Sequence, residues 1–368
     1  MKTADVAIIG AGVIGACIAE TLSRSSRLRV VLLERNQPGC EASNAAAGVL
    51  AVASGQARRG VLLELRRLSG AMFPALVSRL QEETGIDVGY RSDGLISLAF
   101  TEDEELMLRA LVEHRRAQEL RCEMLSAADL LQLEPAVNPG VYGAAIFPGD
   151  RAINSGRLVA ALITAAHRSG VELHQQTVVR SIVRSGSAVR LEVDGDYVEA
   201  AKVIVAAGAW SPQLLAASGV KVPVRPARGE MLAVRSATWQ LRHTLANGEG
   251  YLVPRHGGEV LIGSTTAFDG FEKQVTEEGL GTLRARAAAM VPRFGEATEL
   301  RSWAGLRPCS TIRRPIIAPL PAMENVILAT GHHRNGILLA PMTAQLVTEL
   351  VLGLPPSVLM RPFSYRKH

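Results

Sequence analysis

Short, uniformly apolar runs near the start of the chain give the clearest structural signal in the sequence. Residues 6–9 are all apolar and end at Gly10, which is typical of a buried parallel strand. Residues 12–24 place small residues on one side of a predicted helix, and residues 29–34 predict a second buried strand, apolar between Arg29 and Glu34. The pattern predicts a strand, a helix and a second strand, which together make a βαβ unit.

Helical spacing and strand-like alternation predict the remaining elements. We expect helices over residues 62–84, 101–120, 126–133, 154–167, 281–290 and 341–352. Ser126 is the expected N-cap of one helix and Asn154 or Ser155 of another, while the last helix has Pro341 in its first turn and Gly353 beyond its end. We expect strands over residues 90–100, 171–174, 177–183, 189–193, 197–199, 202–206, 222–235, 250–255, 259–263 and 326–329.

The order of these elements predicts two interleaved domains. Residues 189–193 and 197–199 make a hairpin around Asp194-Gly195, and residues 202–206 and 326–329 are buried parallel strands. Parallel-type segments therefore occur at the start, middle and end of the chain, with antiparallel segments between them. A chain of 368 residues suits two domains, and no internal repeat is visible. With 48% hydrophobic and 20% charged residues, disorder is expected only over residues 355–368.

Charge and cysteine content exclude several classes of protein. The net charge of +5 is small, and the 4% of aromatic residues do not interleave with the arginine clusters. We therefore interpret these clusters as solvated faces, with no nucleic-acid partner and at most a weak preference for small anions. The clustered arginines are Arg58, Arg59, Arg66, Arg67, Arg313 and Arg314.

The four cysteines form no CxxC pair and no zinc-like spacing, which predicts free thiols, a reducing compartment and no metal site. The first strand leads into glycines where a signal peptide would have a cleavage site. No apolar run is expected to reach the length of a membrane span. We expect a cytoplasmic protein.

The first loop carries a motif with a physical mechanism. Gly10, Gly12 and Gly15 form a G-x-G-x-x-G after a strand and at the start of a helix. Gly10 permits the tight turn, Gly12 lets the backbone approach a pyrophosphate, and Gly15 lets the helix pack close to the strand. Glu34, at the end of the next strand, is placed to accept hydrogen bonds from ribose hydroxyls. FAD, NAD and other ADP-containing cofactors all fit this pattern.

Three further stretches resemble the flavin-contacting motifs of the D-amino-acid oxidase superfamily. They are Ser-Asn-Ala-Ala-Ala-Gly at 43–48, Val-Ile-Val-Ala-Ala-Gly-Ala-Trp-Ser at 203–211 and Gly-His-His-Arg-Asn-Gly-Ile-Leu-Leu-Ala-Pro at 331–341. Within that superfamily the chain is most similar to the glycine oxidases of thiamine biosynthesis, a similarity that includes residues 84–90, 250–255 and 303–308.

The resemblance implies an α/β fold (α+β overall) with a Rossmann-like FAD-binding domain and a substrate domain built on an antiparallel sheet. We assign residues 1–85, 147–222 and 300–368 to the FAD-binding domain and residues 86–146 and 223–299 to the substrate domain. A homo-oligomer is also implied.

The same resemblance implies a set of FAD-binding residues. Val179 matches the position whose backbone meets the adenine, and N–H groups at residues 336–338 are expected to face the flavin N1–C2=O edge. The set is Gly10, Gly12, Val13, Ile14, Gly15, Glu34, Arg35, Ser43, Ala46, Ala47, Gly48, Val179, Ala207, Gly208, Trp210, Arg307, Gly331, His333, Arg334, Asn335, Gly336 and Ile337.

Three residues match the family's substrate site. Arg307 matches an arginine that binds the substrate carboxylate, because a guanidinium makes two parallel hydrogen bonds to that group. Arg334 matches a second arginine near the flavin, and Tyr251 matches a tyrosine that bonds the same carboxylate. The alternative is that the arginines form interdomain ion pairs and that Tyr251 belongs to the core.

The sequence departs from the family at two places. Arg313-Arg314 precedes Pro315 where glycine oxidases carry an Asp-Gly pair, near the expected wall of the substrate cavity. Thr266 stands where a larger apolar residue is common. Both departures open the possibility of a bulkier or more anionic amine.

Three more side chains have alternative roles. Some relatives bond flavin through a cysteine near the position of Cys309, but we interpret Cys309 as a small core thiol. His332 and His333 are interpreted as structural, because the family's chemistry needs an oriented, neutral amine more than a strong base.

Two functions follow. The first is FAD-dependent oxidative deamination of glycine or a similar small amino acid or amine, with hydride transfer from Cα to flavin N5 and reoxidation by O₂ to give H₂O₂. The second is the flavoprotein subunit of an amino-acid dehydrogenase complex that passes electrons to a partner.

Overall fold

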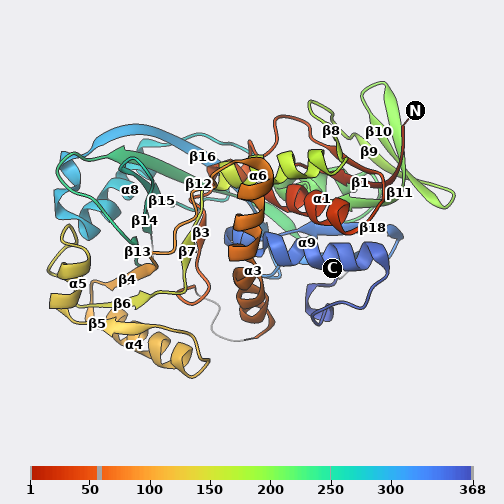
Figure 1. Ribbon diagram of the computed structural model, residues 1–368. Coiled ribbons are helices and arrows are strands. Elements are labelled where there is room, and N and C mark those ends of the chain that lie inside the picture. The colour runs from red at the N-terminus through yellow and green to blue at the C-terminus, as the bar shows by residue number, and fades with distance from the viewer. Residues whose placement is uncertain (1, 56–59, 249, 366–368) are drawn as a thin grey trace.

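The computed structural model describes residues 2–55, 60–248 and 250–365. A mostly parallel sheet and a mostly antiparallel sheet form the two halves of the molecule (Figure 1). Helix α3 (Val61–Thr84) stands near the middle of the view. The predicted mixed α/β fold, with a Rossmann-like half and an antiparallel half, is confirmed.

The first sheet is built around the βαβ unit that the apolar runs predict. Strand β1 pairs in parallel with β2 on one side and with β11 on the other, and β18 pairs in parallel with β11. The order is β17-β18-β11-β1-β2-β8. Helix α1 (Val13–Ser25) connects β1 to β2. The strands are β1 (Lys2–Ile9), β2 (Val30–Leu33), β8 (Glu172–His174), β11 (Asp196–Val205), β17 (Ile316–Leu320) and β18 (Met323–Thr330).

A hairpin extends this sheet, and its bounds differ from the prediction. Strand β10 (Ala188–Val193) pairs with the first half of β11 around Asp194-Gly195, and β9 (Ser181–Ser185) pairs with β10. The predicted strands over 197–199 and 202–206 are one continuous strand, β11. The strand predicted over 177–183 begins only at Ser181, because the Thr177 N–H donates to the Glu34 carbonyl (2.9 Å) and this segment crosses the end of β2.

In the main hydrophobic core, one face of the parallel sheet packs against four helices, namely α1, α3, α6 (Ser155–Arg168) and α9 (Gly336–Leu352). The side chain of Asn154 accepts the N–H of Arg157 (3.0 Å), so Asn154 is the N-cap of α6. Helix α9 begins at Gly336, which places Pro341 inside the helix and corrects the predicted start. The apolar residues Ile337 and Leu338 extend the helix because they are buried.

Residues 333–352 also correct the prediction about membrane-length segments. An 18-residue window of this 20-residue stretch has a mean hydropathy of 1.3, and the stretch is long enough to span a membrane. In the fold, 72% of its apolar window is buried inside the protein, and α9 packs against α1 and α3. Its composition is therefore accounted for by its place in the core.

The second sheet carries the order β16-β12-β15-β14-β13-β4-β6-β5. Its strands are β4 (Leu95–Ala99), β5 (Glu123–Leu125), β6 (Gly143–Phe147), β12 (Val224–Arg235), β13 (Thr244–Ala246), β14 (Tyr251–Pro254), β15 (Glu259–Gly263) and β16 (Thr298–Ser310). The helices of this half are α4 (Glu102–Arg116), α5 (Ala127–Leu133) and α8 (Glu277–Met290). Ser126 caps α5 as predicted.

Strand β16 was not predicted, and it bears on the domain assignment. It pairs with β12 along almost its whole length. Residues 300–310 therefore lie in the antiparallel sheet, although the sequence assigned them to the FAD-binding domain. The rest of the division into domains stays a prediction. Short elements complete the fold: α2 (Ala42–Ala45), β3 (Val49–Leu50), β7 (Arg151–Ala152) and α7 (Ser211–Ala216).

Two predictions are wrong, one about disorder from residue 355 onward and one about the exposure of an arginine. Residues 355–365 are ordered: Phe363 is fully buried, and the Tyr365 hydroxyl donates to the Lys221 carbonyl (3.0 Å). Arg66 is buried and donates to the Ala51 carbonyl, so it does not belong to a solvated face. Residues 366–368, Arg58 and Arg59 lie outside the described residues.

Candidate active site

A cavity of about 510 Å³ lies between the two sheets, at the carboxyl ends of β1, β2 and β11. Parallel α/β sheets bind ligands at this edge, and the volume suits a large cofactor. Among the residues predicted to bind FAD, Gly15, Gly331 and Asn335 do not line the cavity. Those that line it are Gly10, Gly12, Val13, Ile14, Glu34, Arg35, Ser43, Ala46, Ala47, Gly48, Val179, Ala207, Gly208, Trp210, Arg307, His333, Arg334, Gly336 and Ile337.

The glycine loop takes the conformation that its sequence predicts. Gly10 has φ +101°, and a Cβ there would lie 2.7 Å from the Ala206 carbonyl oxygen. A Cβ on Gly15 would overlap the Gly10 carbonyl, so Gly15 serves the packing of α1 against the loop. Gly12 caps α1 without a side-chain hydrogen bond, and the Val13 N–H donates to the Ser43 hydroxyl (2.9 Å). The positive end of the helix dipole therefore meets the cavity and favours an anion.

The Glu34 carboxylate is held beside this loop by backbone donors. Its Oε2 accepts the Ala11 N–H (2.8 Å) and its Oε1 accepts the Asn36 N–H (2.9 Å), and the residue is 8% exposed. Helix N-terminus, glycine loop and fixed carboxylate lie in the order in which a dinucleotide presents its pyrophosphate and ribose. The fold and this end of the cavity define a dinucleotide-binding protein.

The backbone of residues 45–48 forms the neighbouring wall and is anchored from three directions. The Ser155 hydroxyl donates to the Ala46 carbonyl (2.8 Å), and Arg255 donates to the Ala47 carbonyl (2.6 Å). The indole N–H of Trp303, on β16, donates to the Ala45 carbonyl (3.1 Å). Side chains of both halves of the molecule therefore fix a segment that lines the cavity.

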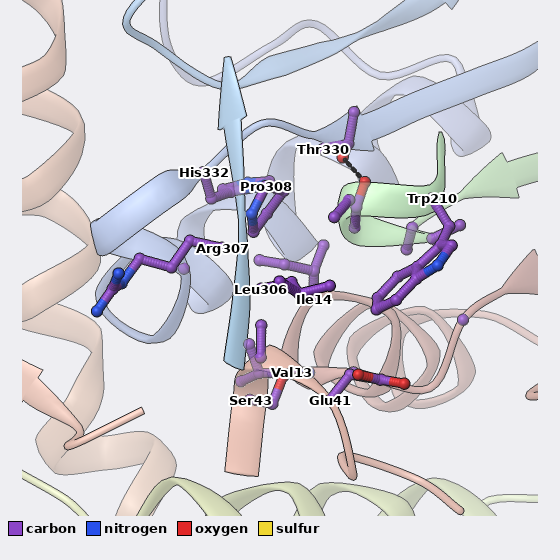
Figure 2. A pocket seen from close by; sticks show the side chains of 18 of the residues that line it. Val13, Ile14, Glu41, Ser43, Trp210, Leu306, Arg307, Pro308, Thr330 and His332 are labelled. Atoms are coloured by element: carbon purple, nitrogen blue, oxygen red, sulfur yellow. Dashed lines mark hydrogen bonds between the residues drawn. The ribbon is translucent and has the colours of Figure 1, made fainter. Parts of the chain in front are cut away.

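Arg307 lies on β16 at one side of the cavity, opposite Trp210 in the close view (Figure 2). Its Nη2 donates to the Ser264 hydroxyl (2.6 Å) and its Nη1 to the Thr265 carbonyl (3.2 Å). No carboxylate of the described residues pairs with it. Burial lowers the pKa of Arg307, while Tyr251 acts in the opposite direction. Because arginine stays protonated in proteins, Arg307 is a cation, and no acidic side chain in the described part of the chain neutralises it.

Arg334 and the two histidines lie at the start of α9. Arg334 donates to the Thr266 hydroxyl (3.1 Å). Burial, and then the charges of Arg334 and Arg307, lower the pKa of His333 to about 4. The Nε2 of His333 is buried and, within the described part of the chain, has no hydrogen-bond partner. His332 is bonded to Thr343 (3.0 Å), and burial lowers its pKa to about 3. Both histidines are therefore neutral at pH 7.

A connection between β15 and α8, residues 264–275, runs over this region, and we call it the strap. Besides its contacts to Arg307 and Arg334, its Phe271 ring lies 5.5 Å from the Trp210 ring, and Lys273 pairs with Glu41 (2.9 Å). Arg228 on β12 fixes the strap through Asp269 (2.6 Å) and through backbone bonds to Ala267. The strap therefore joins the antiparallel half to the parallel half across the site.

The basic pair lies elsewhere than the sequence indicates. Arg313 and Arg314 do not line the cavity, so the basic pair does not form its wall. Cys309 does not line it either and is a free thiol, as are Cys17, Cys40 and Cys122, all within the described residues.

Sequence reasoning missed Ser264, Gly229 and Glu41, which all line the cavity. An isolated glycine in a strand, such as Gly229 in β12, is a recognised sign of close backbone approach and was the available signal. Ser264 carries no such signal, because only the fold brings it to Arg307.

Comparisons with known proteins agree with this geometry. The model of the FAD dependent oxidoreductase family matches residues 5–350. The chain is 37% identical to a glycine oxidase of Geobacillus kaustophilus over 99% of the chain and 97% of the relative. Its structure resembles a crystal structure of glycine oxidase from the same species with a TM-score of 0.97, 36% identity and full coverage of both chains. The chain is also 31% identical to the hydrogen cyanide synthase subunit HcnC of Pseudomonas aeruginosa, over 95% of the chain and 93% of that subunit.

The chain therefore belongs to the family of FAD-dependent oxidoreductases that includes the glycine oxidases. Its cofactor is FAD, and the cradle described above fits that group: Gly10 and Gly12 carry no side chain, the α1 N-terminus faces the cavity, and Glu34 is fixed beside it.

Proposed function

We propose that this enzyme oxidatively deaminates glycine or a similar small amino acid and that O₂ is its electron acceptor. The observation that carries the proposal is the guanidinium of Arg307, which borders the cavity and has no acidic partner among the described residues. The glycine oxidases among the relatives support a small amino acid as substrate.

In this proposal the protein's own side chains orient the substrate. Arg307 binds the carboxylate through charge-assisted hydrogen bonds, which set the angle of the substrate as well as its charge. The Tyr251 hydroxyl, on β14 at the same cavity, adds a donor to that carboxylate, and Arg334 adds a second positive charge. The neutral His333 adds no further charge to this wall at pH 7.

The proposed FAD-binding residues are the cavity-lining members of the predicted set. Gly336 and Ile337, in the first turn of α9, line the cavity, and an α-helix leaves its first N–H groups without internal partners. When bound, FAD supplies the acceptor for a hydride from the substrate Cα at N5, and its reoxidation by O₂ yields H₂O₂.

Arg307→Ala tests the proposal, with Arg313→Ala as a matched control because Arg313 is exposed and does not line the cavity. Loss of a bidentate, charge-assisted contact to substrate should lower kcat/KM for glycine by about 100-fold, mainly through KM. FAD content should stay unchanged. Wild-type kinetics in the Arg307 variant would refute the role of Arg307.

The hydrogen cyanide synthase subunit among the relatives keeps a second function in view. In it, the chain would pass electrons to a partner protein in place of O₂. Anaerobic reduction by glycine followed by admission of air separates the two. Rapid return of the oxidised flavin spectrum supports the oxidase, and a spectrum that stays bleached supports the electron-transferring subunit.

A further inference from the structure

Gly229 lies directly beneath the guanidinium of Arg307. The two residues are on neighbouring strands, since Gly229 of β12 is paired with Gly305 and Ala227 with Arg307 of β16. A Cβ atom on Gly229 would overlap Nη1, Nη2 and Cζ of Arg307, and these are its three nearest atoms. The guanidinium therefore occupies the space that any side chain at position 229 would need.

The backbone does not explain why this position is a glycine. Gly229 is absent from the glycines with positive φ and sits inside a regular antiparallel strand, a conformation open to alanine. A second glycine shows a related contact, because a Cβ on Gly263 would lie 2.5 Å from Met231 Sδ and 2.6 Å from the hydroxyl oxygen of Tyr251. The two side chains proposed to hold the carboxylate both rest on glycines of adjacent strands.

The strap also holds the guanidinium. Ser264 accepts from Nη2 at 2.6 Å and Thr265 accepts from Nη1 at 3.2 Å. Gly229, Ser264 and Thr265, which we call the seat of Arg307, thus fix the place of a guanidinium that lines the cavity. An arginine side chain has several rotatable bonds, and such a seat removes that freedom before the substrate arrives.

We propose that Gly229 is a positioning residue that fixes Arg307 for recognition of the substrate carboxylate. This inference rests on the proposed function, in which Arg307 binds that carboxylate. A methyl group at position 229 displaces the far end of a flexible side chain and no backbone, so the fold tolerates it. The displaced guanidinium of Arg307 then holds the substrate carboxylate in the wrong place. A shift of about 1 Å in such a contact lowers the reaction rate roughly 100-fold.

The test compares the holoenzymes of Gly229→Ala, Arg307→Ala and the double variant with wild type. Gly281→Ala is the control, because a Cβ there meets nothing within 4 Å. Three quantities are measured: FAD per chain, the dissociation constant of acetate from its effect on the flavin spectrum, and the rate of anaerobic flavin reduction by glycine. Acetate is glycine without its amine, so it reports carboxylate binding alone.

We expect Gly229→Ala to keep its FAD and melting temperature while acetate affinity and the second-order rate of reduction by glycine fall about 100-fold. Added to Arg307→Ala, the same change should alter the reduction rate by less than about twofold, because its effect passes through Arg307. If Arg307→Ala is impaired but acetate affinity and the reduction rate of Gly229→Ala stay within about threefold of wild type, the positioning role of Gly229 is wrong and the proposed function stands. An equal loss in the Arg307→Ala background would also overturn it. Wild-type behaviour of Arg307→Ala would refute the proposed function, and the seat with it.

Discussion

Replacing Glu34 by glutamine isolates the part of the site that holds the ribose end of the cofactor. The carboxylate accepts two backbone N–H groups, from Ala11 at 2.8 Å and from Asn36 at 2.9 Å. Glutamine has nearly the same shape but only one acceptor oxygen. Its NH₂ group must therefore face one of the two N–H donors, which loses its partner in a site where Glu34 is 8% exposed.

The expected cost follows from these two bonds. Losing one hydrogen bond to a charged acceptor costs about 1.5–3 kcal/mol, and the bond that remains becomes a weaker, neutral one. A total near 3 kcal/mol corresponds to a fall of ~4 °C in the melting temperature of a chain of this length. Ribose hydroxyls would also lose an ionic acceptor, so the Kd of FAD should rise about tenfold.

Thermal unfolding of the apoprotein and FAD titration, followed by tryptophan fluorescence, measure both effects. Glu41→Gln is the matched control, because Glu41 lines the same cavity and carries the same charge. Glu41 forms partly exposed ion pairs with Arg35 and Lys273, and each pair contributes less than about 1 kcal/mol to stability. If Glu34→Gln is no more harmful than Glu41→Gln, the carboxylate does not organise the loop as described.

Two further changes test the core beside the site. The unfolded chain protonates His332 near its ordinary pKa of 6.5, whereas burial lowers the pKa of His332 in the folded chain to about 3. As the pH falls from 6.5 towards 3, the free energy of unfolding should therefore fall by about 1.4 kcal/mol for each pH unit. His332→Gln, which can still bond Thr343, should flatten that slope in urea unfolding at pH 7 and pH 5, and parallel profiles would contradict the assignment. Gly15→Ala should press a methyl group against the Gly10 carbonyl, displace the glycine loop and yield protein with little FAD. Full flavin content would show that the loop tolerates the shift.

Local pattern was enough for the first half of the nucleotide-binding fold. The strand over β1, the turn at Gly10 and the helix α1 depend on residues adjacent in sequence, so apolar runs and glycine spacing predict them. Glu34 follows from the same reasoning, because the end of β2 fixes its place. The cap of α6 at Asn154 is likewise a local choice.

Tertiary contacts decided what the sequence did not predict. Strand β16 mixes charged, small and aromatic residues and forms because β12 pairs with it. The early start of α9 depends on burial of Ile337 and Leu338. The resemblance to a family indicated Arg307, but the two residues that hold its guanidinium, Gly229 in β12 and Ser264 in the strap, come from two separate elements. No spacing rule in a single sequence contains that arrangement.

The position of β1 in its sheet also dictates how late in synthesis this protein can fold. Val6 lies opposite Val30 on one side, but its other neighbour is Lys202, and β11 in turn needs β18. Helix α9, near the end of the chain, then covers α1. A ribosome therefore releases the first apolar strand and helix long before their partners exist. Such non-local pairing folds slowly, so the apolar faces of β1 and α1 stay exposed until β11, β18 and α9 have been synthesised.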